Sequence, residues 1–407
     1  MFWYNFGINS LIAGARLAAR WNPKVQKWVE GRRDLMERLR KAIPKGERII
    51  WFHSASLGEF EQGRPVMEAV RQQMPEYKIL LTFFSPSGYE IRKNYNGADY
   101  IFYMPFDKPA MAREFIEIVK PEIAVFIKYE FWLNHIEELR RSGCKTYLIS
   151  AIFRPKSIFF RPWGGAFRRA LGTYRKIFVQ NGDSKELLQG IGIENMVVAG
   201  DTRFDRVAAL CENAPRIETI EQFRGGQLMM VAGSTWGPDE EAMLESINRH
   251  PEVKFVIAPH EMDENRINSF MSRVRGGAVR YTQSDGVELD KCQVMIIDTI
   301  GLLSAIYRYA DVAYVGGGFG VGIHNTLEPA TYGIPVAFGP RYEKFREAKE
   351  LIACGAACSI TSSDEFAVWF DGMISDKEAR LKAGKAAKVY VEENRGATDL
   401  ILAELQK

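Results

Sequence analysis

The stretch Val315–Pro340, VGGGFGVGIHNTLEPATYGIPVAFGP, is the most informative part of this sequence for predicting the fold. An apolar run leads into a loop that is very rich in glycine, and a short helix pattern and a second apolar run follow the loop. The loop glycines are Gly316, Gly317, Gly318, Gly320 and Gly322. Because glycine lets a backbone approach a ligand closely, the pattern predicts a nucleotide-binding loop between a strand and a helix.

The residues after the glycines support this interpretation. We expect the helix to open at His324-Asn325, where its N-terminus stabilises negative charge. Glu328 follows one turn later, a position from which its carboxylate can accept both hydrogen bonds of a ribose diol. The sequence therefore predicts that Glu328 contacts the sugar of a bound nucleotide.

Outward from this stretch, β-rich runs alternate with helix-like runs, which predicts parallel sheets with helices on both faces. The pattern pauses over 201–226 and then restarts, so we expect an α/β fold of two doubly wound, Rossmann-like domains. The predicted strands are 48–52, 78–82, 123–127, 146–150, 176–180 and 196–199, then 227–232, 254–258, 279–281, 294–297, 312–315 and 335–338. The predicted segments are an N-terminal segment 1–48, a first domain 49–205, a connector 206–226, a second domain 227–385 and a C-terminal helical segment 386–407, which we expect to be broken near Gly396.

Two further turns follow predicted strands, at the sheet ends where ligands bind in open parallel sheets. In WFHSASLGEF, Trp51–Phe60, Glu59 stands at a strand-to-helix junction. It is either a general base or a carboxylate that stabilises the helix N-terminus. In VAGSTWGPDEEAML, Val231–Leu244, the residues Gly233-Ser234-Thr235 either hold a phosphate or form a plain capped turn.

The segment Met1–Arg48 has an uneven charge. It holds eleven basic and four acidic residues, a surplus of +7, although the whole chain has a net charge of +3. The uncharged, aromatic stretch Met1–Ala15 comes first. An apolar stretch followed by a basic one is typical of a peripheral anchor on an anionic membrane. The alternative is a helix that packs its apolar residues against its own domain, namely Phe2, Trp3, Phe6, Leu11 and Ile12.

A second basic stretch, Phe153–Lys176, contains seven Lys and Arg residues and no acid. Four aromatic residues are interleaved with them: Phe159, Phe160, Trp163 and Phe167. Such a surface can bind nucleic acid or a phosphorylated lipid. The alternative is a solvated helix face above core aromatics.

The composition excludes several classes of protein. With 46% hydrophobic and 26% charged residues the chain is an ordinary folded protein, and no apolar run reaches the roughly 18 residues of a spanning helix. The five cysteines form no CxxC pair, which argues against a disulfide scaffold or a zinc ribbon.

Together the motifs resemble the bacterial Kdo transferases, which attach 3-deoxy-D-manno-oct-2-ulosonic acid to the lipid A precursor. The family's H-A-A-S-V-G-E turn is similar to His53–Glu59, and its G-G-H-N-P-L-E-P-A loop to Val321–Ala330. Its A-G-S-T-W-x-G-E-E segment is similar to Ala232–Glu241, and its G-N-x-K-F-D segment to Gly200–Asp205. The N-terminal segment Met1–Arg48 matches the family's membrane contact and the basic stretch that follows it.

The sequence departs from the family at two motifs. The family's E-T-E-x-W-P-N appears as Lys128–Asn134, so a lysine replaces the first glutamate. Its P-R-H appears as Pro259-His260-Glu261, without the arginine that would meet the nucleotide. Either His260 or a backbone group is then left to contact the base.

The resemblance implies an inverting glycosyltransferase of the GT-B fold with its two domains facing a central cleft. The donor would be CMP-Kdo and the acceptor lipid IV A, at the cytoplasmic face of the bacterial inner membrane, where the protein would be peripheral or monotopic. Glu59 would be the catalytic base, and no metal, no cofactor and no nucleic-acid partner is expected. The implied donor-binding residues are Gly233, Ser234, Thr235, Pro259, His260, Gly317, Gly318, Gly322, His324, Asn325 and Glu328. The implied acceptor-binding residues are Ser56, Gly58, Glu130, Arg154 and Arg161.

Two other functions stay open. An isomerase that acts on a UDP-amino sugar shares this two-domain architecture, and the segment GDTRFDRV is similar to those 2-epimerases, but such an enzyme needs no membrane contact. A non-catalytic, membrane-associated nucleotide-binding protein would keep the glycine-rich loop and would not need Glu59.

Overall fold

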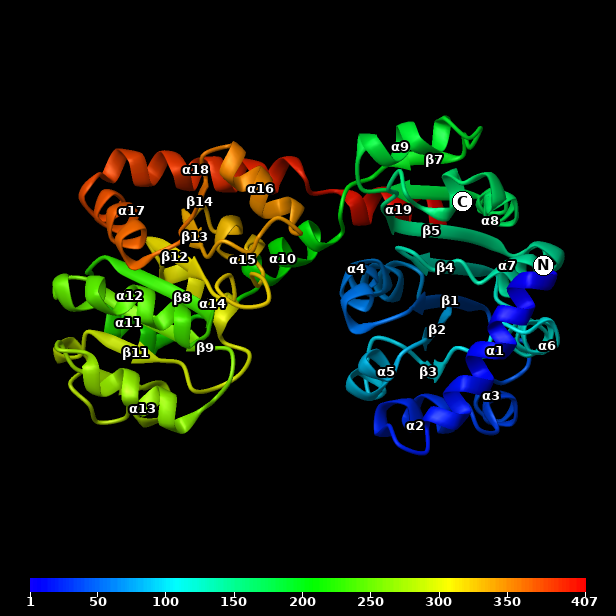
Figure 1. Ribbon diagram of the computed structural model, residues 1–407, viewed down its shortest axis with the longest axis horizontal. Coiled ribbons are helices and arrows are strands. Elements are labelled where there is room, and N and C mark those ends of the chain that lie inside the picture. Colours follow the sequence, from blue (N-terminus) through cyan, green and yellow to red (C-terminus); the bar gives the residue numbers. More distant parts are fainter. The chain divides into compact units, whose positions relative to one another are not determined.

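A computed structural model describes the whole chain, residues 1–407. The chain divides into two compact units, and each is built on its own seven-stranded parallel sheet. Unit 1 comprises Met1–Arg206 and Arg395–Lys407, and unit 2 comprises Val207–Asn394. In Figure 1 each sheet lies between helices, so the predicted α/β fold of two doubly wound units is confirmed.

The sheet of unit 1 has the order β3-β2-β1-β4-β5-β6-β7, and all its strand pairs are parallel. The interior strand β1 places His53 between Thr82 of β2 and Phe126 of β4. The strands are β1 (Ile49–Ser54), β2 (Lys78–Phe83), β3 (Tyr100–Tyr103), β4 (Ile123–Ile127), β5 (Lys145–Ala151), β6 (Lys176–Val179) and β7 (Met196–Val198).

Successive residues of β1 point to opposite faces of this sheet, and each face is covered by helices. Trp51 packs in the core under α3, α6 and α7, whereas Phe52 packs in the core under α4 and α19. The helices of this unit are α1 (Phe2–Ala18), α2 (Pro23–Glu30), α3 (Leu35–Ala42), α4 (Leu57–Gln73), α5 (Pro86–Arg92), α6 (Pro109–Val119), α7 (Leu133–Ser142), α8 (Gly165–Leu171), α9 (Gly182–Gln189) and α19 (Ala397–Leu405), and α10 (Arg203–Glu212) crosses the division between the units.

The sheet of unit 2 has the order β10-β11-β9-β8-β12-β13-β14, again parallel throughout. The strands are β8 (Met229–Thr235), β9 (Lys254–Pro259), β10 (Ala278–Arg280), β11 (Val294–Ile296), β12 (Val312–Val315), β13 (Val336–Phe338) and β14 (Ala357–Ser359). Because β8, β9 and β12 are neighbours, the loops that follow them emerge at one edge of the sheet.

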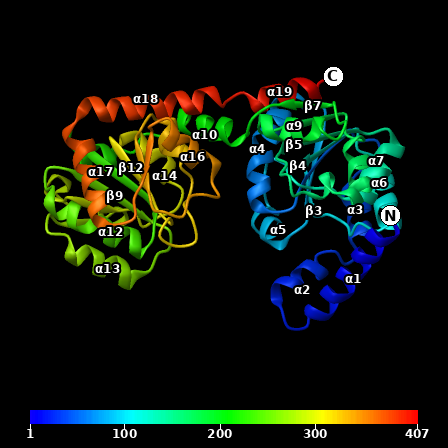
Figure 2. The ribbon, with the colours of Figure 1, turned by 45° about the horizontal axis from the view of Figure 1, so that its top comes forward.

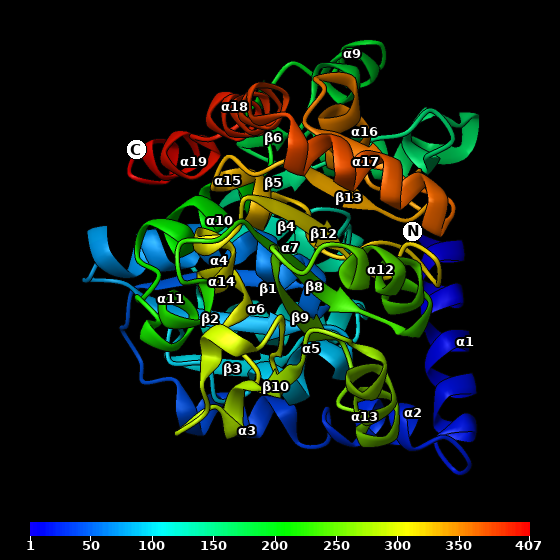
Figure 3. The same ribbon diagram turned by 90° about the vertical axis from the view of Figure 1, so that its left-hand side faces the viewer.

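Helices α12, α13 and α17 cover one face of this sheet, and α11 and α14 cover the other (Figure 3). The helices are α11 (Glu218–Arg224), α12 (Gly237–Arg249), α13 (Glu264–Arg273), α14 (Leu303–Ile306), α15 (Leu327–Thr331), α16 (Arg346–Ala353), α17 (Ser363–Ser375) and α18 (Lys377–Glu393). The expected helix start at His324-Asn325 is wrong: residues 321–326 are irregular, and α15 begins at Leu327.

The chain end returns to unit 1. Helix α18 ends at Glu393, Gly396 takes a φ of 104°, and α19 then packs on α4. Asp205 holds this junction, because its carboxylate accepts the Gly396 N–H at 2.6 Å and the Thr398 N–H at 2.7 Å. The predicted break of the C-terminal helix near Gly396 is therefore confirmed.

Helix α1 keeps most of its aromatic side chains exposed. Of the five apolar residues that could have packed against the domain, only Ile12 is buried, against Trp28 and Phe106. The side chains of Phe2 and Trp3 are 74% and 80% exposed. Figure 2 shows α1 and α2 standing away from the sheet of unit 1. No helix of the chain combines the length and the apolar character needed to cross a bilayer.

The second basic stretch is mixed. Phe159 is buried and Phe160 and Phe167 are half-buried, so these aromatics belong to the core of unit 1. Trp163 is 74% exposed, and Arg161 and Arg169 are exposed beside it in sequence. Part of the segment is therefore core, and part is an exposed aromatic and cationic surface.

Candidate active site

Glu59 lies where the sequence pattern predicts, at the end of β1. Strand β1 ends at Ser54, α4 begins at Leu57, and Glu59 is the third residue of that helix. Its Oε2 accepts the Ala55 N–H at 2.7 Å, so the carboxylate does stabilise the turn that opens the helix. The side chain is only half-buried, so this contact and access to a ligand are compatible.

The surroundings of Glu59 raise its pKa to about 7. Burial is the largest cause, since it disfavours the charged form, and the negative charge of Glu130 adds to it. The Ala55 N–H and the positive charge of Lys128 act in the opposite direction. A carboxylate with a pKa near 7 can accept a proton from a substrate hydroxyl at neutral pH, as a general base must.

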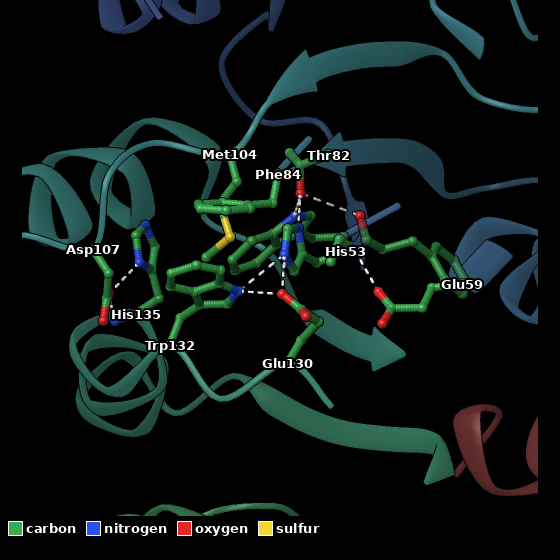
Figure 4. A network of polar contacts seen from close by, with 12 residues as sticks. His53, Glu59, Thr82, Phe84, Met104, Asp107, Glu130, Trp132 and His135 are labelled. Carbon is green, nitrogen blue, oxygen red and sulfur yellow. Dashed lines mark hydrogen bonds and ion pairs between the residues drawn. The ribbon is translucent and has the colours of Figure 1, made fainter. Parts of the chain in front are cut away.

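A buried network lies beside Glu59 (Figure 4). His53 Nε2 is 3.0 Å from Glu130 Oε2, and Trp132 Nε1 donates to the same oxygen at 2.5 Å. On its other side, His53 Nδ1 is 2.9 Å from Thr82 Oγ1, which accepts the Trp51 Nε1–H at 2.7 Å. The Thr82 hydroxyl can donate to Nδ1 while Nε2–H donates to Glu130; the Trp132 Nε1–H then donates to Glu130 and not to His53 Nε2, which lies 3.1 Å away. Burial lowers the pKa of His53 despite Glu130.

This network bears on the predicted acceptor residues. Glu130 is only 8% exposed, and two donors already occupy its Oε2, which favours an electrostatic role beside Glu59 over direct contact with an acceptor. Ser56 and Gly58 lie in the same turn as Glu59. Burial raises the pKa of Tyr129, the neighbour of Glu130, and the charge of nearby Arg154 acts in the opposite direction, whereas no contact joins Arg161 to this group.

A second buried network was not foreseen from the sequence. Asp107 is fully buried and accepts hydrogen bonds from the His135 N–H at 2.9 Å, from His135 Nδ1 at 2.6 Å and from the Tyr4 hydroxyl at 2.5 Å. Asn134 Nδ2 also donates to Asn5 Oδ1 at 2.9 Å. These contacts attach the first turn of α1 to the first turn of α7. Their signal in the sequence is weak, because Tyr4 and Asn5 lie more than a hundred residues from their partners Asp107 and Asn134.

In unit 2 the glycine-rich loop packs tightly on the turn after β8. The Gly316 N–H donates to Gly233 O at 2.9 Å, and a Cβ on Gly316 would come within 2.3 Å of Ser234 O. Gly317 takes a φ of 91°, a left-handed value that favours glycine. Close packing of backbone on backbone is therefore one reason for these glycines.

Asp239 fixes the glycine-rich loop by hydrogen bonds, and the sequence pattern did not predict this role. This fully buried carboxylate accepts the Gly317 N–H at 2.9 Å, the Trp236 N–H at 2.8 Å and the Tyr314 hydroxyl at 2.8 Å. The Gly317 amide is thus occupied within the protein. The amide of Gly318 donates to no protein group, unlike the amides of Gly316 and Gly317, although Gly318 itself is buried.

The two hydroxyl groups after β8 differ in availability. Thr235 is fully buried, and its hydroxyl donates to Glu240 Oε1 at 2.8 Å. Ser234 takes a φ of 54°, a strained value for serine, and its half-buried hydroxyl has no partner. The structure therefore leaves the Ser234 hydroxyl, and not that of Thr235, available at this edge of the sheet.

Three aromatic rings form a stack beside this turn. The His260 ring lies 4.9 Å from the Trp236 ring and 4.3 Å from the His324 ring, with 29° between the planes in both pairs. Pro259 ends β9 next to Thr235, and the His260 N–H donates to Thr235 O at 2.9 Å. Burial and the neighbouring His260 lower the pKa of His324. The structure thus brings together the predicted residues that follow β8, β9 and β12.

Glu328 lies in the first turn of α15, and its carboxylate is held in place. Its Oε2 accepts the Ser304 hydroxyl at 2.7 Å, and its Oε1 accepts Asn325 Nδ2 at 3.0 Å. The side chain is half-buried and each carboxylate oxygen has further lone pairs, so both can still accept from a ligand. Gly322, with a φ of 143°, belongs to the loop that leads to this turn.

Comparisons with known proteins agree with this geometry. The family model described as 3-Deoxy-D-manno-octulosonic-acid transferase (kdotransferase) matches residues 32–206. The 3-deoxy-D-manno-octulosonic acid transferase of Aquifex aeolicus is 25% identical over 372 residues, which cover 88% of this chain and 95% of that protein. The enzyme of the same name from Chlamydia trachomatis is 26% identical over 366 residues, which cover 86% of this chain and 84% of that protein.

The chain is similar to Kdo transferases over most of its length, which supports a transferase function. Solved structures agree at the level of the fold. A UDP-GlcNAc 2-epimerase from Neisseria meningitidis has a TM-score of 0.61 at 16% identity, and Acinetobacter baumannii MurG has a TM-score of 0.54 at 12% identity; each comparison covers 88% of this chain and 99% of the other. Both sheets and these neighbours establish the GT-B fold for this chain.

Proposed function

We propose that the chain transfers Kdo from CMP-Kdo to lipid IV A with Glu59 as the general base. The observation that carries the proposal is the Glu59 carboxylate, whose pKa of about 7 suits proton abstraction at neutral pH. The Ala55 N–H fixes one carboxylate oxygen, and the other oxygen is left for the proton of the acceptor.

The reaction is a single displacement that inverts the anomeric carbon of Kdo. The acceptor hydroxyl oxygen attacks that carbon while its proton moves to Glu59. The bond between the anomeric carbon and the phosphate oxygen of CMP breaks, and the electron pair leaves with CMP. The step needs acceptor and donor in contact, so both units must act together.

Unit 2 offers the groups that a departing CMP requires. The Ser234 hydroxyl and the Gly318 amide can donate to the phosphate, and Glu328 can accept from the ribose hydroxyls. The stack of Trp236, His260 and His324 presents aromatic faces for a pyrimidine in the place of the family's arginine. The proposed donor site also includes Gly233, Pro259, Gly322 and Asn325, because they form the backbone and turns at the same edge of the sheet.

The acceptor is a lipid, so the proposal includes a peripheral position on the cytoplasmic face of the inner membrane. Four of the five exposed large apolar side chains of α1, those of Phe2, Trp3, Phe6 and Leu17, fall within about 100° of one another around the helix, and Leu11 lies outside this stripe. An exposed apolar stripe beside basic residues favours an interfacial helix. Ser56 and Gly58 in the Glu59 turn, and Arg154 and Arg161, are the proposed contacts to the phosphorylated sugar.

The test is release of CMP from CMP-Kdo by the purified chain, with and without lipid IV A in detergent. We expect release only in the presence of the acceptor, together with a Kdo-bearing lipid product. Release of CMP without a product lipid, or no release from any preparation, would refute the transfer reaction. Incubation with UDP-N-acetylglucosamine gives the control for the 2-epimerase alternative, since an isomerase would produce the epimer without any lipid.

A further inference from the structure

A small cationic cavity lies outside the groups described above, between α1, α2 and the start of α6. Its volume is about 290 Å³. This is room for about ten water molecules, since each occupies about 30 Å³ in the liquid. Four cationic side chains and one carboxylate line it, together with apolar residues such as Met111. The charged residues are Arg16, Glu30, Arg32, Arg33 and Lys108.

The positive charges around the cavity are not balanced within the protein. Arg16, Arg33 and Lys108 form no ion pair, unlike Arg40, which pairs with Glu114 at 2.6 Å. The one lining carboxylate, Glu30, accepts Gln26 Nε2 at 2.9 Å. The cavity therefore has a net positive charge without a protein counter-ion.

Arg32 adds a buried charge to the same wall. Its guanidinium is almost fully buried and donates only to backbone carbonyls, those of Met104 at 2.8 Å, Trp28 at 2.7 Å and Phe84 at 2.8 Å. No carboxylate pairs with it, and burial lowers its pKa to about 9. An unpaired buried charge is costly, and an anion nearby would reduce that cost.

The start of α6 contributes further positive potential. Lys108 is the N-cap residue of this 11-residue helix and Pro109 occupies its first turn, and no side chain caps the free amides. Lys108 and Met111, one from each side of this start, both line the cavity. A helix N-terminus favours anions, and phosphates in particular, so the helix adds to the attraction of the four cations.

The cavity lies next to the exposed apolar stripe of α1. Arg16 lines the cavity, and Leu17, the next residue of the helix, is 53% exposed on the stripe. Trp21 follows at 74% exposure. If α1 lies in the membrane interface, as the proposed function requires, the mouth of the cavity is at the level of the lipid head groups.

We propose that this cavity is a phosphate-ester site that holds the head group of an anionic phospholipid. Arginine side chains bind phosphate through paired N–H groups, and three of the four cations are arginines. Arg32 has a structural role, because it ties α2 to the loops before α5 and α6. That role explains the presence of Arg32. It does not explain why Arg16, Arg33 and Lys108, which have no ion-pair partner, line the same cavity.

The experiment compares two variants with the same change of charge. In the cavity variant, Arg16→Gln, Arg33→Gln and Lys108→Gln are combined, and Arg32 is left in place because it supports the fold. In the matched control, Arg20→Gln, Lys24→Gln and Lys27→Gln are combined; these residues lie on or between the same helices and do not line the cavity. Circular dichroism melts establish that both variants fold.

Each protein is bound to phosphatidylcholine vesicles that contain either phosphatidic acid or oleic acid, adjusted to the same zeta potential. We expect the wild type and the control to bind the phosphatidic-acid vesicles about ten-fold more tightly than the oleic-acid vesicles, because only the former present a phosphate ester. We expect the cavity variant to lose this preference. Equal affinity of the wild type for both vesicles, or the same loss in both variants, would overturn the proposal.

A second arm separates the lipid from a free ligand. Free sn-glycerol 3-phosphate should raise the Tm of the wild type and of the control, and not that of the cavity variant, if the cavity recognises the phosphate ester itself. A shift in Tm without any preference between the vesicles would overturn the lipid as the source. The inference rests on the proposed membrane position of α1, but these measurements need no Kdo transfer. A chain that transfers no Kdo would therefore refute the proposed function and leave the vesicle result intact.

Discussion

His53 Nε2 lies 3.0 Å from Glu130 Oε2, and this buried pair raises the pKa of the neighbouring Glu59 through the charge of Glu130. Trp132 donates to the same Glu130 oxygen, which keeps the carboxylate in one orientation. The two carboxylates therefore differ in their surroundings. Glu130 accepts hydrogen bonds from two donors, whereas Glu59 has a raised pKa that suits a general base.

Replacing Glu59 tests the base directly. We expect Glu59→Gln to lower kcat about 100- to 10,000-fold while the protein stays folded, because the amide cannot accept the proton of the acceptor hydroxyl. The measurement is transfer by the purified variant, with circular dichroism as the check of folding. Glu68→Gln, on the same helix in an exposed pair with Arg64 at 2.6 Å, is the control and should retain nearly full activity. Turnover of the Glu59 variant at the wild-type rate would remove Glu59 from the mechanism.

The charges beside Glu59 should move the pH profile in opposite directions. Glu59 must be ionised to act, so kcat/KM should fall as the pH drops through about 7. Glu130→Gln removes a negative charge that raises this pKa, so the acidic limb should move to lower pH. Lys128→Gln removes a positive charge that lowers it, so the limb should move to higher pH, in each case by up to about one pH unit. Shifts in the same direction would contradict the electrostatic account.

The raised pKa of Glu59 also has a consequence for stability. The folded state holds the Glu59 proton up to about pH 7, whereas an unperturbed glutamate loses it near pH 4.5, so folding is favoured when this group is protonated. That contribution is present below about pH 4.5 and is lost as the pH rises through 7. Glu59→Gln should therefore raise the free energy of unfolding above pH 7, on the order of 2 kcal/mol for this half-buried position, and change it little at pH 4. Urea titrations at both pH values measure the difference, and equal effects at the two would refute the linkage.

Most of the fold is predictable from the sequence, and the omissions share a cause. The pattern of apolar runs locates twelve strands, but not β3 (Tyr100–Tyr103) or β14 (Ala357–Ser359). Both are short edge strands with mostly half-exposed residues: Ala357–Ser359 has three residues, and Tyr100–Tyr103, although apolar throughout, is too short for its periodicity to identify it. The early start of α15 at His324-Asn325 was predicted wrongly because the loop residues before Leu327 mimic a helix opening.

The candidate site is predictable in its position and less so in its partners. Chemistry-bearing residues after β1, β8, β9 and β12 follow from the rule that ligands bind at the carboxyl ends of parallel strands. The roles of Asp239 and Glu130 do not follow, because each depends on groups about 75 residues away, Tyr314 for one and His53 for the other. Only the sheet order brings these residues together.

The ribose contact proposed for Glu328 is tested by binding. We expect Glu328→Ala to weaken CMP binding about ten- to a hundred-fold, because hydrogen bonds from the ribose to a charged acceptor are lost. Binding of lipid IV A should change little. Isothermal titration calorimetry with each ligand makes the comparison, and Glu343→Ala, an exposed residue of the same unit, is the control. Unchanged affinity for CMP would exclude Glu328 from the nucleotide site.

The membrane contact of α1 is tested by salt and by a single exposed side chain. The surplus of +7 in Met1–Arg48 should attract the chain to anionic vesicles, and high salt should weaken this part, since the Debye length falls to about 3 Å at 1 M. Insertion of Phe2, Trp3 and Phe6 does not depend on charge, so part of the binding should persist at high salt.

Phe6→Ser should reduce the part that resists salt, because it removes an exposed aromatic ring from the stripe, by about 2 kcal/mol or some thirty-fold in affinity. Leu381→Ser, an equally exposed apolar residue on α18 of unit 2, is the matched control and should bind as the wild type does. Deleting the first fifteen residues should leave binding that high salt releases completely. Co-sedimentation with neutral and anionic vesicles measures all three. Equal binding to both kinds of vesicle would refute the electrostatic attraction, and no binding, or an equal effect of the two serine substitutions, would show that α1 does not enter the membrane interface.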